Sequence, residues 1–506
     1  MKAARSCRSW TTALLSVVFL IAVVACAPPE GDHEGTVQIE EIPITTTSDT
    51  ARELFEEGQY LLDVGRGVKA REKFQAAIAE DPGFVRAHVN QSNAALSFKE
   101  FQTCLDTASQ HLENAGEGEK LMVEINRTLL SNDNERGLDL AQQFVEKFPR
   151  SPRARIILAG MQANQNDHDG ARASFEKALA LLPDSAGALF GIANSYLFGE
   201  PKDFAMAEDR ARSAIAAYPD EAKAHELMGD IKRAQNDLEA ALEAYGQAAT
   251  TDPTLAAAQH KKGHVNSFLG RIEDARAAYD AGIAVAPPES KAGLAVFKAF
   301  TRIHEGDVPR ALDELEALAD NLAGMGTPAD QVKGLQVFAL TSHATAALHA
   351  GLFDRAEQAV ARRNALQMSI ARDVGTEDAK RLQEANCQMW DGLLAAYKGD
   401  AGGAAEYAEK MAELVASDDN PRKMEPYHWV LGMSALRAGD HGKAVEHLRQ
   451  ADYKNNMYIR YRLAEAEEGA GNVQEAKKLF GEVATFNFNS VGFALVREEA
   501  KRRAAS

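Results

Sequence analysis

Residues 222–255 contain the pattern that decides the fold, and they read AKAHELMGDIKRAQNDLEAALEAYGQAATTDPTL. Ala241, Tyr245 and Ala248 are spaced i, i+4 and i+7, which places them on one face of a helix. The polar run at 235–237 predicts a turn before this helix, and the residues before the turn predict a first helix. The stretch therefore predicts a helical hairpin whose helices pack through small residues and one aromatic ring.

This hairpin pattern returns along most of the chain. Ala241 and Ala275 are 34 residues apart, and so are Tyr245 and Tyr279. Because one hairpin of this length cannot bury its own apolar face, the copies predict a stack in which neighbours bury each other. The copies with a small, an aromatic and a small residue before a proline are Ala70, Phe74, Ala77 and Pro82; Ala171, Phe175, Ala178 and Pro183; Ala241, Tyr245, Ala248 and Pro253; and Ala275, Tyr279, Gly282 and Pro287.

The period and the order of residue types resemble the tetratricopeptide repeat. The resemblance implies an all-α fold, a right-handed α-α superhelix of about twelve hairpins between residues 51 and 483, least regular at 119–149 and 331–415. A capping helix is expected to close the stack at the C-terminal end. Weaker copies follow a glycine that suits a left-handed helix cap, and these glycines are Gly306, Gly351, Gly399, Gly439 and Gly471.

The first 26 residues resemble the signal of a bacterial lipoprotein. Three basic residues precede an apolar run at 13–24, which is shorter than a membrane span, and Cys26 follows closely. The resemblance implies cleavage before Cys26 and acyl chains on that residue, which anchor the protein in a membrane. Ala27 stands where an aspartate commonly retains lipoproteins in the inner membrane, so the outer membrane, facing the periplasm, is implied. The alternative is an ordinary cleavage site with a chance cysteine.

The chain divides into six predicted parts. These are a signal peptide at 1–25, the lipidated cysteine with a flexible tether at 26–48, an N-terminal tetratricopeptide array at 49–319, a joint at 320–330, a less regular C-terminal array at 331–488, and a capping helix and tail at 489–506. A second joint is predicted at 417–426, where proline and acidic residues gather. Longer ordinary loops are the alternative at both places.

The formal net charge is −18, and it is −21 without the first 25 residues. A surface of this charge repels nucleic acid and favours cationic partners, although solubility is the plainer explanation. Cys104 and Cys387 lie too many repeats apart for a disulfide bond. Cys104 stands where other repeats have alanine, so we expect a buried free thiol there.

The sequence contains no motif for catalysis or for phosphate binding. It lacks a P-loop, a Gly-x-Gly-x-x-Gly after a strand, a His-Glu-x-x-His and a Gly-x-Ser-x-Gly. His225-Glu226 comes nearest, but it lacks the second histidine of a zinc protease. We therefore predict a protein without enzymatic activity and without a cofactor.

The resemblance also implies where a partner binds. In tetratricopeptide proteins the first helix of each hairpin lines a concave groove. The residues of this chain at the inward-facing positions are Arg153, Ile156, Phe190, Asn194, Leu197, Lys223, Glu226, Asp230, Arg233, His260, His264, Ser267, Trp429, Met433, Tyr458 and Tyr461. Their mixture of aromatic, apolar and charged groups predicts a groove for a protein or peptide, with a merely solvated wall as the alternative. The family's carboxylate-clamp pattern is only half met, by Phe190 and Asn194.

Four of these residues suggest a sharper hypothesis. His260 and His264 are four apart on one predicted helix, and Glu226 and Asp230 hold the equivalent positions one repeat earlier. Two imidazoles facing two carboxylates would make a zinc site or a proton-sensitive pair. Ordinary ion pairs on the groove wall are the commoner arrangement of such groups.

Three classes of function remain. The first is a non-enzymatic, membrane-anchored scaffold that binds a protein or peptide partner in the bacterial envelope, in assembly, secretion, polysaccharide export or peptidoglycan remodelling. The second is a periplasmic solute- or glycan-binding lipoprotein in which Trp429, Tyr458 and Tyr461 stack on sugar rings. The third is an enzyme with no recognisable motif.

Overall fold

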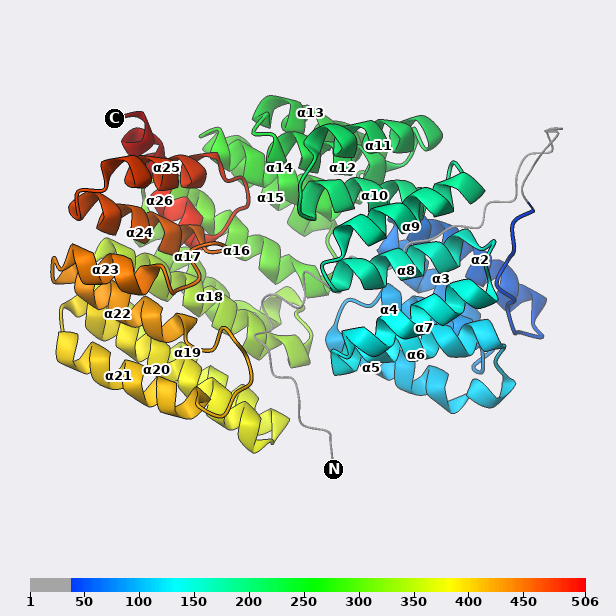
Figure 1. The fold of residues 1–506 in the computed structure, drawn as a ribbon, viewed down its shortest axis with the longest axis horizontal. Helices are drawn as coiled ribbons and strands as arrows, with labels where there is room; N and C mark the ends of the chain where they lie inside the picture. The colour runs from blue at the N-terminus through cyan, green and yellow to red at the C-terminus, as the bar shows by residue number, and fades with distance from the viewer. Residues whose placement is uncertain (1–37) are drawn as a thin grey trace. The chain divides into compact units, whose positions relative to one another are not determined.

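Residues 38–506, the part of the chain that the computed structural model describes, are helical and contain no β-strand (Figure 1). Helices α2 to α25 form twelve consecutive hairpins, which confirms the predicted superhelix of paired helices. A last helix, α26 (Val491–Ala505), follows them. The hairpins are α2 (Asp49–Asp63) with α3 (Gly67–Glu80), α4 (Val85–Asn93) with α5 (Phe98–Gln110), α6 (Glu117–Ser131) with α7 (Asn134–Lys147), α8 (Pro152–Asn164) with α9 (His168–Leu181), α10 (Ala186–Phe198) with α11 (Phe204–Ala217), α12 (Ala222–Ala234) with α13 (Leu238–Thr251), α14 (Ala256–Phe268) with α15 (Ile272–Val285), α16 (Pro288–Glu305) with α17 (Val308–Asn321), α18 (Ala329–Ala350) with α19 (Phe353–Val374), α20 (Glu377–Lys398) with α21 (Ala401–Val415), α22 (Glu425–Arg437) with α23 (His441–Leu448), and α24 (Met457–Gly469) with α25 (Val473–Thr485).

One close contact recurs inside the hairpins and explains the period of the sequence. A Cβ added at Gly229 on α12 would lie 2.4 Å from a ring carbon of Tyr245 on α13, which is closer than real Cβ atoms come. Tyr245 is fully buried. The second helix therefore approaches the first so closely that the ring fits only over a glycine. Two other hairpins repeat the contact, with Gly58 under Phe74 and Gly263 under Tyr279.

The helix ends also follow the sequence. α9 ends at Leu181, shortly before Pro183, and α13 ends at Thr251, shortly before Pro253. Proline cannot continue a helix, so it ends the hairpin at these places. All five glycines predicted as caps have a left-handed backbone, and their φ values are +89° at Gly306, +71° at Gly351, +81° at Gly399, +78° at Gly439 and +87° at Gly471.

The longest helices lie at 329–398, in the second of the two stretches that the sequence predicts to be least regular. α18, α19 and α20 each have 22 residues, whereas the helices of the regular copies have 13 to 15. The longer helices stretch the spacing between equivalent positions, so the 34-residue period fails there. No helix within residues 38–506 is both long enough and apolar enough to cross a lipid bilayer.

The chain forms two compact units. Among the described residues, unit 1 holds 38–235 and 243–253, and unit 2 holds 236–242 and 254–506. The joints predicted at 320–330 and 417–426 lie inside unit 2, between α17 and α18 and between α21 and α22. The helices on the two sides of each connection pack against each other. A hinge at either place stays a prediction.

The end of the predicted tether lies against unit 1. The Thr45 amide donates a hydrogen bond to Glu119 Oε1 (3.0 Å), and the Thr46 hydroxyl donates one to Asp81 Oδ2 (2.6 Å). Ile42 is buried. Residues 38–48 are non-helical, as expected, but they are held by the folded unit. Residues 27–37 of the predicted tether lie outside the described residues, as do Cys26 and the predicted signal peptide.

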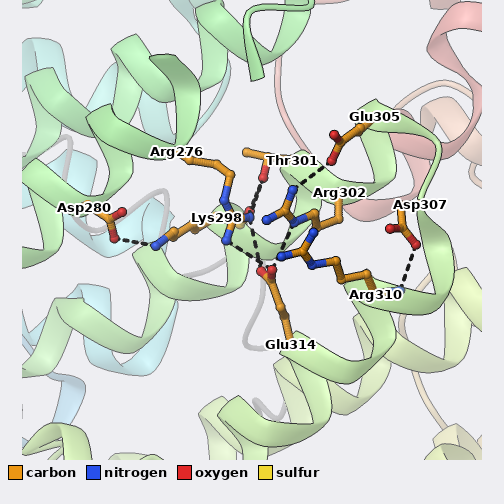
Figure 2. A network of polar contacts seen from close by, with 9 residues as sticks. All are labelled: Arg276, Asp280, Lys298, Thr301, Arg302, Glu305, Asp307, Arg310 and Glu314. Atoms are coloured by element: carbon orange, nitrogen blue, oxygen red, sulfur yellow. Dashed lines mark hydrogen bonds and ion pairs between the residues drawn. The ribbon is translucent and has the colours of Figure 1, made fainter. Parts of the chain in front are cut away.

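A network of ion pairs joins three consecutive helices of unit 2 (Figure 2). Both terminal nitrogens of Arg276 on α15 donate to the Glu314 carboxylate on α17, at 3.1 and 3.2 Å. Arg302 Nε on α16 donates to the same carboxylate at 3.1 Å, and Thr301 accepts a further bond from Arg276. The side chains of Arg276 and Arg302 are 15% and 9% exposed, so Glu314 neutralises two largely buried cations.

We expect Glu314→Gln to lower the free energy of unfolding by about 1–2 kcal/mol, because both guanidiniums then lose their shared carboxylate. Asp280→Asn is the matched control. Asp280 pairs with Lys298 in the same network but is 58% exposed, so its loss costs about 0.5 kcal/mol or less. Urea titrations of the two variants check the difference, and equal losses would contradict the role given to Glu314.

Candidate functional site

The first helices of the hairpins form a layer in each unit. In unit 1, α8 packs on α10 and α10 on α12, and in unit 2, α14 packs on α16 and α16 on α18. We define the first-helix layer of unit 1 as α2, α4, α6, α8, α10 and α12. The first-helix layer of unit 2 consists of α14, α16, α18, α20, α22 and α24. These layers are the surfaces on which the sequence places a partner.

The first-helix layer of unit 1 closes on itself. The Tyr60 hydroxyl donates to Glu221 Oε1 (3.0 Å), and Arg66 Nε donates to Glu221 Oε2 (2.7 Å). Tyr60 lies on α2, Arg66 directly precedes α3 and Glu221 directly precedes α12, so the first hairpin contacts the sixth. A Cβ added at Gly65 would lie 2.6 Å from the Lys223 side chain. The two ends of the layer therefore touch.

Charged side chains fill the layer of unit 1 near this contact. Asp63 is fully buried, and Arg86 and Arg153 are 3% and 5% exposed. Asp63 Oδ1 accepts a hydrogen bond from Gln59 Nε2 (3.0 Å), and Asp63 Oδ2 lies 3.6 Å from Arg153 Nη2. Burial raises the pKa of the Asp63 carboxyl well above its ordinary range, against the opposing effect of Arg153. These groups form a polar interior and not an open surface.

The residues predicted to line the groove of unit 1 are mostly buried. Lys223 and Asn194 are half-buried. Lys223 Nζ donates to Glu226 Oε2 at 3.2 Å, and Arg233 Nη2 donates to Asp230 Oδ1 at 3.1 Å. These contacts are ordinary ion pairs, which the sequence offers as the alternative to a zinc site. The buried members are Arg153, Ile156, Phe190, Leu197, Glu226, Asp230 and Arg233.

Helix α26 lies on the first-helix layer of unit 2 (Figure 1). It packs against α16, α18 and α24 and against the second helix α25. The Phe493 ring is fully buried and meets the Phe268 ring of α14 edge-on, with 5.5 Å between centroids. A Cβ added at Gly492 would lie 2.7 Å from the Tyr458 Cβ of α24. The predicted capping helix is present, but it packs across four first helices and not only on the last hairpin.

Arg497 is the largest fully buried side chain in the described part of the chain, and it lies on this helix. Its guanidinium donates to the Phe268 carbonyl and to Asn487 Oδ1, each at 3.3 Å, and lies 5.1 Å from the Phe268 ring centroid. The carboxylate within ion-pair distance belongs to Glu498, the next residue on the same helix, at 3.5 Å. Burial lowers the pKa of Arg497. A buried cation with weak neutral partners is held at a cost.

The other end of α26 is bound by charge. Arg503 Nη1 lies 3.1 Å from Glu465 Oε1, and Arg503 also pairs with Glu468; both carboxylates lie on α24. Its guanidinium stacks on the Phe480 ring of α25 at 4.6 Å from the centroid. The neighbouring Arg502 is 77% exposed and pairs with Glu499 of its own helix. Arg503 therefore fixes α26 to the layer, and Arg502 does not.

Comparison with known proteins identifies the repeats. Tetratricopeptide repeat models match residues 55–114, 130–186 and 202–256, and another matches residues 426–450. These four stretches are tetratricopeptide repeats. Both models describe a repeat and not a catalytic family.

Solved tetratricopeptide structures are similar in their helical fold alone. The chain matches the APC/C hetero-tetramer Cut9–Hcn1 with 14% identity and a TM-score of 0.41, over 89% of this chain and 76% of that one. It matches a tetratricopeptide repeat protein from Parabacteroides merdae with 12% identity and a TM-score of 0.33, over 58% of this chain and all of that one.

One curated relative is similar over a short stretch. It is cellulose synthase operon protein C from Pseudomonas fluorescens, with 32% identity over 148 residues. The match covers 28% of this chain and 12% of that protein, so the chain spans only a small part of the relative's length.

The predicted groove residues of unit 2 are also largely internal. His264 Nδ1 lies 2.7 Å from the Tyr279 hydroxyl and 3.2 Å from Asn489 Nδ2, just before α26. The Tyr458 hydroxyl lies 2.7 Å from that of Tyr397. His260 and Trp429 are half-buried, and the buried members are His264, Ser267, Met433, Tyr458 and Tyr461.

The described residues contain no set of side chains that would hold a zinc ion. Glu226 and Asp230 belong to unit 1, whereas His260 and His264 belong to unit 2. Among residues 38–506, no group of three or more histidine, cysteine, aspartate or glutamate side chains is arranged to hold a metal ion. Cys104 and Cys387 are buried free thiols, as expected for Cys104, and burial raises the pKa of Cys104 to about 12.

Sequence reasoning missed the contribution of α26 to the layer. The helix carries Phe493, Arg497, Ala500 and Arg503 at steps of three and four, which is the stripe of a helix that packs along its length. An arginine inside such a stripe is the signal that could have found it. Reading 489–506 only as a closing segment assigned the charged residues to solvent.

Proposed function

We propose that this chain is a non-catalytic tetratricopeptide scaffold, anchored in a membrane through Cys26, that binds a protein or peptide partner in the bacterial cell envelope. The observation that carries the proposal is α26 on the first-helix layer of unit 2. This layer holds a helix through a buried ring, a close helix–helix approach and ion pairs. A surface with these groups has the chemistry to hold a helix from another protein.

The envelope location rests on the sequence. Cys26 closely follows an apolar run, the net charge disfavours nucleic acid as a partner, and Ala27 favours the outer membrane, facing the periplasm. The stretch similar to cellulose synthase operon protein C supports polysaccharide export among the envelope processes.

The solute- or glycan-binding alternative is weaker. Two of the three rings proposed to stack on a sugar, Tyr458 and Tyr461, are each 4% exposed. Tyr458 is also bound by the Arg462 guanidinium, which donates to its hydroxyl at 2.7 Å. Trp429 is half-buried and packs edge-on against Trp390. A sugar needs an accessible ring face, so the observed packing favours the scaffold.

Cys26→Ala is expected to abolish incorporation of radiolabelled palmitate and to move the protein from the membrane to the soluble fraction. The acyl chains supply the membrane affinity, so their loss releases the chain. Cys104→Ala is the matched control, since that thiol is buried and free. Retention of label and membrane attachment by Cys26→Ala would reject lipidation at this residue.

Partner binding is tested with the full mature chain and a solubilised envelope extract. Recovery of one stoichiometric protein supports the scaffold. Recovery of none, together with saccharide-dependent quenching of tryptophan fluorescence that is lost in Trp429→Phe, would favour the glycan receptor.

A further inference from the structure

We propose that the first-helix layer of unit 2 is a binding site for an amphipathic helix with an aromatic residue near its start and an arginine about three turns later, and that α26 occupies this site until such a helix replaces it. The inference rests on the proposed function, because it names the partner's chemistry at the same surface. The attachment of α26 and the groups that the helix contacts support this assignment.

α26 is not required to complete any hairpin. The twelve pairs end with α25 at Thr485, and the non-helical residues 486–490 connect α25 to α26. α26 belongs to none of these pairs, so its departure leaves the contacts within each pair in place. It is joined to the last hairpin by this short tether, in which Asn487 is buried and Asn489 contacts His264, and the tether gives it a high effective concentration.

The site offers three features that select a helix of this kind. Phe268 supplies a ring edge for an aromatic side chain, and the close approach to Tyr458 requires a small residue beside it. At the other end, Glu465 and Glu468 with the Phe480 ring receive a guanidinium. Gly492, Phe493 and Arg503 of α26 meet these groups in turn along the helix.

Arg497 and Arg503 of α26 differ in how well the site satisfies them. Arg503 is well matched by two carboxylates, whereas the buried Arg497 has two long hydrogen bonds and an Nε with no acceptor in the described part of the chain. This unpaired donor weakens the attachment of α26 near the middle of the helix. A partner helix that places an apolar residue there avoids the cost, so it competes with α26 despite the tether.

Charge complementarity favours the same partner. The chain carries a net charge of −18, and the helix that fills the site ends in Lys501, Arg502 and Arg503. A cationic segment is attracted to an acidic protein before contact, and the attraction weakens with salt. We therefore expect a basic amphipathic helix and not an acidic one.

The test uses the full chain and a labelled synthetic peptide of residues 489–506. In wild type, α26 competes and the peptide binds weakly. In Arg503→Glu, a carboxylate faces Glu465 and Glu468, so α26 leaves and we expect the wild-type peptide to bind at least about tenfold more tightly. Arg502→Glu makes the same charge change on the exposed side of the helix and should bind like wild type.

The affinities of the variant peptides and variant chains decide whether the site exists. Weaker binding of a peptide carrying the Arg503→Glu change, with an unchanged Arg502→Glu peptide, supports the site. Equal affinity of the two variant chains for the wild-type peptide overturns it. Arg503→Ala, which adds no charge, is the second variant if Arg503→Glu shows no cooperative unfolding in urea. Dimerisation of the variants without peptide would make a second copy the occupant and overturn the choice of a separate partner. If all variants recover the same stoichiometric envelope protein equally, the result supports the scaffold function but rejects this site.

Discussion

Gly229→Ala is expected to lower the free energy of unfolding by about 3 kcal/mol, although alanine is the better helix former. The added Cβ would lie 2.4 Å from a ring carbon of Tyr245. The ring has no room to move, because it is fully buried and its hydroxyl donates to Asp230 Oδ1 at 2.7 Å. The hairpin must therefore open, and the stacking that the repeat depends on is lost locally.

Gly246→Ala is the control for this prediction. Gly246 lies one residue after Tyr245 on the same helix, and a Cβ there would meet nothing within 4 Å. The substitution is expected to raise stability by about 0.5–1 kcal/mol, because alanine loses less conformational entropy in a helix. Urea titrations of the two variants give the comparison. Stabilisation by Gly229→Ala would show that the glycine–ring contact does not set the hairpin spacing.

Acidification is expected to unfold unit 2 before unit 1. Burial lowers the pKa of His304, His343 and His349 to about 4, helped by Arg355 and Arg362 at His343 and by Arg462 at His349. All three belong to unit 2. The folded protein then binds fewer protons than the unfolded chain between pH 6.5 and 4. The stabilisation is complete above pH 6.5 and is lost as the pH falls toward 4, by up to about 3 kcal/mol per histidine.

Urea unfolding at pH 7.5 and pH 4.5 measures this loss. His343→Leu should reduce the pH dependence, since both ring nitrogens of His343 are buried without a hydrogen-bond partner among the described residues. Leucine at that place removes an unsatisfied polar group, so stability at pH 7.5 should not fall. Identical pH dependence in wild type and His343→Leu would contradict the assignment.

The part of the fold that repeats was predictable from sequence. Small and aromatic residues at helical spacing predict the hairpins, proline and glycine predict their ends, and the same local contact, Gly229 with Tyr245 or Gly263 with Tyr279, recurs. Each contact lies within one period, so a 34-residue window contains all the information it needs.

The candidate site was not predictable in the same way, because it depends on contacts between residues that are far apart in the sequence. Tyr60 reaches Glu221 and Arg497 reaches Phe268 across gaps of 161 and 229 residues, which a 34-residue repeat does not encode. Arg153, Phe190 and Tyr458 are buried at positions where the family pattern predicts a groove wall. Residues at groove positions are identified by the period, but their exposure depends on what the ends of the chain cover.

Hydrogen exchange on the full wild-type chain tests most directly whether α26 is a replaceable occupant of the first-helix layer of unit 2. The account predicts that amides 491–505 exchange faster than those of α24 (Met457–Gly469), and that the difference grows in Arg503→Glu but not in Arg502→Glu. Equal protection of α26 and α24 in all three proteins would show that the helix is a fixed part of unit 2 and would contradict the account.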